Sequence, residues 1–110
     1  MGKYIELTSA NFEETTKAGV SMVDFWAPWC GPCRMMKPIF ERVASEVNDS
    51  ENGVKLYTLN VEENRDIAAK LGIRAIPTVK GFSGGKESFT KSGVLAEATI
   101  KEYATSIING

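Results

Sequence analysis

The chain has 110 residues, which suffices for one domain and predicts a single domain over residues 1–110. Its 13 basic and 14 acidic residues give a formal net charge of −1, a balance that argues against nucleic-acid binding, which usually needs a basic excess. No apolar run is long enough to cross a bilayer, so a membrane-spanning protein is not expected.

The amino-terminal part predicts one short strand followed by one helix. Residues 4–7 read as a strand, and residues 11–17 follow as a helix. Thr8 or Ser9 would cap the start of that helix, since their hydroxyl groups accept hydrogen bonds from unpaired backbone N–H groups. Gly19 would end it.

The middle of the chain continues this alternation of strands and helices. Residues 20–27 are almost continuously apolar apart from Asp24, which predicts a strand covered on both faces. Apolar side chains then recur every three or four positions across residues 33–47, the pattern of an amphipathic helix. Residues 54–61 alternate as a strand, and residues 64–71 read as a short helix.

The last third predicts a hairpin and a final helix. Residues 78–82 and 87–91 flank the turn sequence SGGK, a hairpin signal, and residues 95–108 have helical spacing. The alternating first half needs crossover helices and allows parallel strands, whereas the hairpin is antiparallel. We therefore expect an α/β protein with a mixed sheet and helices on both faces.

The two cysteines, Cys30 and Cys33, directly follow the apolar strand. Structural zinc usually takes four Cys or His ligands, and a chain with two cysteines and no histidine fits such a site poorly. A structural disulfide is a second reading, but a loop this short would stabilise the fold by about 2 kcal/mol at most. Thiol–disulfide exchange agrees best with the spacing, and no metal is expected.

Cys30 lies where a strand ends and a helix begins. Backbone N–H groups at a helix start lack intrahelical partners and favour a negatively charged thiolate, which lowers the pKa of the first cysteine. Cys33 lies one turn further on, so the two sulfurs face the same side. Pro32 has no N–H, and the first helical turn tolerates that.

On these residues the chain resembles the thioredoxin family, itself an example of a Cys-X-X-Cys motif with a lowered thiol pKa. The match has its core in WAPWCGPC (residues 26–33) and extends to Asp24, Pro38, GIRAIPT (residues 72–78) and Gly93. Element order and spacing match over essentially the whole chain. The resemblance implies a thioredoxin fold, a five-stranded mixed sheet flanked by four helices.

The resemblance implies a protein-disulfide reductase that needs no cofactor besides a redox-active Cys30–Cys33 disulfide. Cys30 would be the exposed nucleophile that attacks a substrate disulfide, and Cys33 would resolve the mixed disulfide. A thioredoxin reductase would restore the dithiol, so the expected partners are that reductase and disulfide-bonded proteins. Gly31 and Pro32 resemble the reducing members of the superfamily. We expect a monomer.

Other substrate-binding residues follow by position in the family. Pro77 matches its cis-proline, and the backbone of Ile76 would pair with an extended substrate segment. Trp29, Ile76, Gly93 and Val94 would form an apolar rim, with Gly31 and Pro32 beside them. Taken alone, Trp29 also reads as a core side chain, and the Ile76–Pro77 pair as an ordinary turn.

Asp24 stands out because it interrupts an otherwise apolar strand. Burial would raise its pKa, which suits an acid or base working near neutral pH. The family role is proton exchange with Cys33 through water, and the alternative is a carboxylate that reaches solvent at the strand end. Thr58 stands where many members have a lysine, and the sequence leaves open whether Lys80 replaces that cation.

Two functions compete on this basis. An electron carrier uses both sulfurs, whereas a binding module would use the same fold as a rigid surface. The intact WCGPC motif with Asp24 favours the carrier. The first 19 residues show no long apolar segment typical of a signal peptide, so we expect a cytoplasmic protein, in a compartment where structural disulfides are rare.

Overall fold

The computed structural model describes residues 5–48 and 53–109. It confirms the expected order of strands and helices. In chain order the elements are β1 (Ile5–Leu7), α1 (Phe12–Lys17), β2 (Val20–Trp26), α2 (Gly31–Asn48), β3 (Val54–Asn60), α3 (Arg65–Lys70), β4 (Thr78–Ser83), β5 (Lys86–Ser92) and α4 (Glu97–Asn109). Tyr4, the expected first residue of β1, lies outside the described residues.

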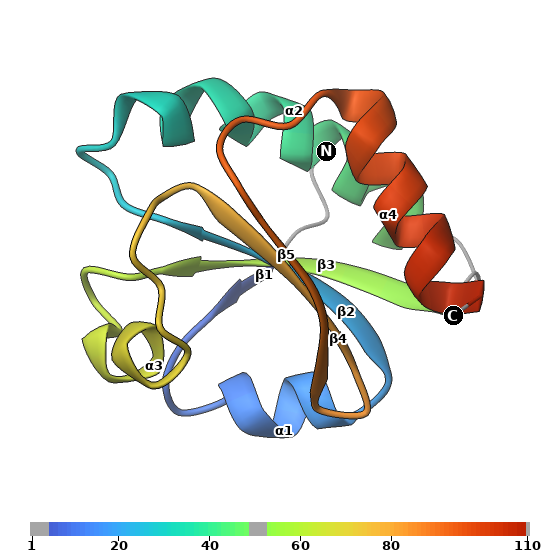
Figure 1. Cartoon of the computed structure of the whole chain (residues 1–110), viewed down its shortest axis with the longest axis horizontal. Coiled ribbons are helices and arrows are strands. Elements are labelled where there is room, and N and C mark those ends of the chain that lie inside the picture. Colours follow the sequence, from blue (N-terminus) through green and yellow to red (C-terminus); the bar gives the residue numbers. More distant parts are fainter. Residues whose placement is uncertain (1–4, 49–52, 110) are drawn as a thin grey trace.

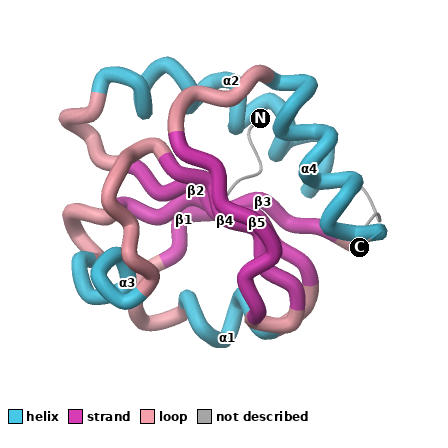
Figure 2. The backbone as a smooth tube through the Cα atoms, viewed as in Figure 1, coloured by secondary structure: helices cyan, strands magenta, loops and turns pink. Residues whose placement is uncertain are grey.

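The five strands form one mixed sheet in the order β1-β3-β2-β4-β5. β3 runs parallel to both β1 and β2, whereas β4 runs antiparallel to β2 and to β5. The crossover helix α2 links β2 to its parallel neighbour β3, and α1 links β1 to β2, as the alternating first half predicted. Figure 2 shows the strands through the middle of the molecule and the helices outside them.

Each face of the sheet carries its own hydrophobic core. Figure 1 shows α2 and α4 on one face and α1 and α3 on the other. On the α2/α4 face, Met22 and Leu56 of the sheet pack with Phe40 of α2. On the α1/α3 face, Phe25 of β2 packs with Phe12 of α1. Consecutive residues of β2 therefore enter different cores, which explains its nearly continuous apolar sequence.

The start of α1 differs from our expectation. Asn11, not Thr8 or Ser9, immediately precedes the helix, because a turn intervenes in which the N–H of Phe12 donates to the Thr8 carbonyl at 3.0 Å. Ser9 has other partners: its N–H donates to Oδ1 of Asn64 at 2.9 Å. This contact ties the β1–α1 connection to the start of α3.

The end of α2 is fixed to the sheet by a side-chain amide. Nδ2 of Asn48 donates to the carbonyl of Leu56 at 3.0 Å, and Oδ1 of Asn48 accepts from the Leu56 N–H at 2.7 Å. The amide therefore pairs with the strand as a neighbouring backbone would. Because the other end of α2 carries the cysteines, this contact helps to set the direction of the helix across the sheet.

Gly81 leaves room for the core beneath the hairpin. A Cβ at this position would overlap the ring of Phe89 and lie 2.7 Å from Cδ1 of Ile107. Phe89 in turn stacks on Tyr103 of α4, with ring centroids 4.4 Å apart. The glycine that interrupts an apolar strand thus serves the packing of α4 on the sheet.

We predict that Gly81→Ala lowers the free energy of unfolding by about 1–3 kcal/mol, the usual range for overpacking a core. Urea unfolding followed by circular dichroism measures this change. Gly31→Ala is the matched control, since a Cβ at Gly31 has no atom within 4 Å. Equal stability of the two variants would contradict this account of Gly81.

Candidate active site

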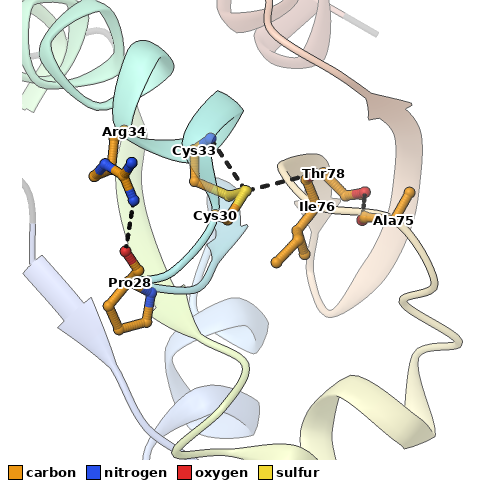
Figure 3. The surroundings of a disulfide bond; sticks show 7 residues. All are labelled: Pro28, Cys30, Cys33, Arg34, Ala75, Ile76 and Thr78. Atoms are coloured by element: carbon orange, nitrogen blue, oxygen red, sulfur yellow. Dashed lines mark hydrogen bonds between the residues drawn. A yellow bond between two sulfur atoms is a disulfide. The ribbon is translucent and has the colours of Figure 1, made fainter.

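The two cysteines form a disulfide at the start of α2. Cys30 immediately precedes the helix, Cys33 lies in its first turn, and their Cα atoms are 5.2 Å apart. The backbone N–H of Cys33 donates to Sγ of Cys30 at 3.2 Å (Figure 3). One of the N–H groups at the helix start is thus directed at the first sulfur, where it stabilises negative charge once the disulfide is reduced.

The chain between β2 and α2 is held in a tight turn. The N–H of Cys30 donates to the Ala27 carbonyl at 3.2 Å, and the N–H of Arg34 donates to the Cys30 carbonyl at 3.2 Å. The guanidinium of Arg34 donates to the Pro28 carbonyl at 3.1 Å (Figure 3). These contacts fix the first turn of the helix and both sulfurs with it.

The expected exposure of Cys30 is wrong for this disulfide form. Cys30 is 5% exposed and Cys33 is 2% exposed. Both pack in a small cluster with Ala27 and Ile76, and Sγ of Cys30 lies 3.7 Å from the Ile76 carbonyl oxygen. The loop carrying Ile76 covers the sulfur from the opposite side to α2 (Figure 3).

Several residues expected at the substrate site meet beside this disulfide. The Ile76–Pro77 bond is cis, as the family resemblance predicted. The N–H of Gly93 donates to the Pro77 carbonyl at 2.8 Å, which joins the β5–α4 loop to the cis-proline loop. Trp29 and Val94 are 65% and 41% exposed, so neither is an ordinary core side chain.

Asp24 is buried in the middle strand on the α2/α4 face. It lies in register with Thr58 of β3 and Val79 of β4, and it is 3% exposed. Its Oδ1 atom has no hydrogen-bond partner within the described part of the chain. Burial without a compensating charge raises the pKa of Asp24 from 3.8 to about 7.

Lys80 does not replace the lysine that is missing at position 58. It pairs in register with Val23, the neighbour of Asp24 on β2, so its side chain leaves the opposite face of the sheet. Its ammonium group donates to Glu87 and to Thr90, both at 2.9 Å. The side chain is also 7% exposed, so it does not turn outward to solvent.

A cavity of about 470 Å³ lies beside Asp24 and Cys33, and sequence reasoning missed most of its lining. The lining residues are Asp24, Trp26, Pro28, Cys33, Arg34, Lys37 and Thr58. The signal for two of them was present in the spacing. Trp26 follows Asp24 by two positions on a strand, and Lys37 follows Cys33 by four on a helix, so each shares a face with its partner.

The comparisons with known proteins agree with this geometry. The thioredoxin family model matches residues 3–106. The chain belongs to the thioredoxin family. It is 40% identical to a thioredoxin of Buchnera aphidicola over 111 residues, covering 99% of this chain and 100% of that protein.

Two further relatives differ in length and source. A chloroplastic M-type thioredoxin of Chlamydomonas reinhardtii is 43% identical over 88 residues, which are 80% of this chain but only 61% of that protein. The crystal structure of Malassezia sympodialis thioredoxin superposes with a TM-score of 0.83 at 31% identity, covering 98% of this chain and 93% of that one.

As a thioredoxin-family member, the protein is a protein-disulfide oxidoreductase. Thioredoxins use a redox-active disulfide and need no other cofactor, which makes Cys30–Cys33 the redox group. The family implies a thioredoxin reductase and disulfide-bonded substrates as partners. Among residues 5–48 and 53–109, no group of three or more metal-ligating side chains occurs and no helix could span a membrane.

We predict that the buried carboxyl of Asp24 makes the fold less stable as pH rises from about 4 to about 7. In this window the folded state holds a proton that the unfolded state has lost, so the free energy of unfolding falls. The full penalty is on the order of 4 kcal/mol. Asp24→Asn should match the parent near pH 4 and exceed its stability above pH 7, measured by urea unfolding.

Asp66→Asn is the control for this measurement, because a hydrogen bond from Ser9 holds the pKa of the exposed Asp66 below its usual range. This substitution should not stabilise the protein above pH 7. A parent and an Asp24→Asn variant with parallel stability curves would refute the assignment of the pH dependence to Asp24.

We also predict that Lys80→Met leaves the pKa of Asp24 unchanged, because the ammonium lies across the sheet and is paired with Glu87. Thr58→Lys should lower the pKa of Asp24, since it places a cation beside the carboxyl on the same face. Carbon-13 NMR of the aspartate carboxyl reads both titrations. A shift caused by Lys80→Met would contradict the placement of the two groups on separate faces.

Proposed function

We propose that this protein acts as a monomeric reductant of protein disulfides in the cytoplasm, with Cys30 as nucleophile and Cys33 as resolving thiol. The observation that carries the proposal is the N–H of Cys33 directed at Sγ of Cys30 at the helix start. In the reduced protein this donor and the helix dipole favour the Cys30 thiolate. The thiolate is the form that attacks a disulfide.

The reaction transfers two electrons in two exchange steps. The Cys30 thiolate attacks one sulfur of the substrate disulfide, which forms a mixed disulfide and releases the other substrate sulfur as a thiolate that takes a proton from water. Cys33 then loses its proton and attacks Sγ of Cys30. The second substrate thiolate leaves, is protonated, and the Cys30–Cys33 disulfide remains for a thioredoxin reductase to reduce.

Asp24 takes the proton of Cys33 in the second step. Both residues line the same cavity, and an aspartate with a pKa of about 7 exchanges protons efficiently at neutral pH. The exchange passes through water. Water can enter the cavity because two of its lining residues, Arg34 and Lys37, are exposed to solvent.

The substrate lies across the apolar surface beside the disulfide. An extended segment pairs with the backbone at Ile76, directly before β4, and contacts Pro77. Trp29, Val94 and the neighbouring Gly93 form the rim, while Gly31 and Pro32 present backbone without bulky side chains. The exposure of Trp29, next to Cys30, and of Val94, next to Gly93, supports this use, because exposed apolar surface often marks a binding site.

The cytoplasm suits this chemistry because its thiols are kept reduced, so oxidised product is continuously returned to the dithiol. A monomer suits it because one chain supplies both cysteines and every residue of the proposed rim. Size-exclusion chromatography with light scattering distinguishes the monomer from a dimer.

We predict that the parent protein accelerates the reduction of insulin disulfides by dithiothreitol and that Cys30→Ser leaves only the uncatalysed rate. Turbidity of precipitating insulin chains measures the rate. Cys33→Ser retains the attacking sulfur and should accumulate a mixed disulfide, visible as a covalent adduct under non-reducing conditions.

The two serine variants control for each other, since each removes one sulfur from the same helical turn. A parent no faster than dithiothreitol alone, or an adduct formed through Cys33 in the Cys30→Ser protein, would overturn the proposed roles. In the first case the chain would be a scaffold with this fold.

A further inference from the structure

Three buried polar atoms without partners belong to residues that line the cavity between β2, β3 and α2. They are Oδ1 of Asp24, Oγ1 of Thr58 and Nε1 of Trp26, none of which meets a hydrogen-bond partner in the described residues. Asp24 is 3% exposed and Thr58 is 6% exposed. Native proteins rarely leave such atoms unpaired, and water commonly satisfies them where a cavity is large and polar enough.

The sheet register places these three residues on one face of the sheet. Thr58 lies directly opposite Asp24 on the parallel neighbour β3, at the usual strand spacing of about 4.8 Å. Trp26 follows Asp24 by two positions, so its side chain leaves the same face. Cys33 borders the cavity from α2.

The donors and acceptors complement one another. The hydroxyl of Thr58 and the indole N–H of Trp26 both donate, and the carboxyl of Asp24 accepts. A cavity of about 470 Å³ is far larger than the roughly 10–15 Å³ that one water molecule needs, so it has room for several. Water between these groups would satisfy all three.

We propose that Thr58, with Trp26, positions the water that carries the proton between Cys33 and Asp24. Thr58 is thus a positioning residue for the second exchange step, in the place where related proteins have a cation. This inference rests on the proposed role of Asp24, because Thr58 would hold the water through which Asp24 takes the proton.

The hydroxyl acts on the charge of Asp24 in a defined direction. Through water it donates a hydrogen bond to the ionised carboxyl and so favours the charged form. The other charged groups facing the cavity are Arg34 and Lys37 of α2. β4 presents the apolar Val79 to this face, and its Lys80 lies on the opposite face with Glu87.

Thr58→Val tests the proposal because it removes the hydroxyl and keeps the shape of the side chain. We expect the pKa of Asp24 to rise by about half a unit to one unit, the size of one lost hydrogen bond. The attack of Cys33 on a preformed mixed disulfide should slow about three- to tenfold at neutral pH, which corresponds to the same energy. The pH at which this rate is half-maximal should rise together with the pKa of Asp24.

Thr58→Ser is the matched control, since it keeps the hydroxyl and should restore the parental titration and rate. Carbon-13 NMR of the Asp24 carboxyl in the oxidised protein reads the titration without any turnover. The free energy of unfolding in urea provides a second readout, which distinguishes an unpaired Thr58 hydroxyl from a hydrogen-bonded one. If the buried hydroxyl is unpaired, its removal in Thr58→Val should make the protein more stable than the parent, because the cost of burying it is lost.

The outcomes separate this inference from the function it rests on. If Thr58→Val titrates and reacts like the parent, or is more stable, Thr58 has no positioning role, while Asp24 retains its own. If Asp24→Asn resolves mixed disulfides at the parental rate, the role of Asp24 itself fails. A titration shift in Thr58→Val that Thr58→Ser reverses supports the proposal.

Discussion

The hydrogen bond from the Cys33 N–H to Sγ of Cys30 depends on a helix that begins after a short turn at the end of a buried strand. β2 is covered on both faces, so its direction is fixed by two hydrophobic cores. α2 then starts at Gly31, and the contact of Asn48 with Leu56 fixes its far end to β3. The position of the Cys30 sulfur next to the Cys33 N–H therefore follows from the packing of the whole sheet.

The site also needs segments that are far apart in the sequence. The cis Ile76–Pro77 bond precedes β4, and Gly93 follows β5, yet a backbone hydrogen bond joins the two loops beside the cysteines. Gly93 has a φ of 96°, a conformation that favours glycine. Antiparallel pairing of β4 and β5 brings these loops to the same end of the sheet, next to the start of α2.

Most of the fold was predictable because it follows from periodicity, and the cysteine pair was predictable because its motif is local. The details that were not predictable depend on tertiary partners. Ser9 reads as a helix cap, but it binds Asn64, and a turn at Thr8 places the helix start after Asn11. Cys30 reads as exposed from its motif, but the loop at Ile76, 46 residues further along the chain, covers it. The partner of Lys80 depends on the register of the hairpin.

The two buried ionisable residues, Asp24 and Lys80, lie on opposite faces of the sheet. Adjacent positions of β2 point to opposite faces, so the side of β2 that meets Lys80 cannot be the side that carries Asp24. Lys80 has two close acceptors, which satisfy its ammonium. Asp24 has no cation of this kind among the described residues, and burial therefore keeps its proton until the pH is near 7. A fold built only for stability would pair or replace this carboxyl, and its place beside Cys33 agrees with the proton transfer proposed for it.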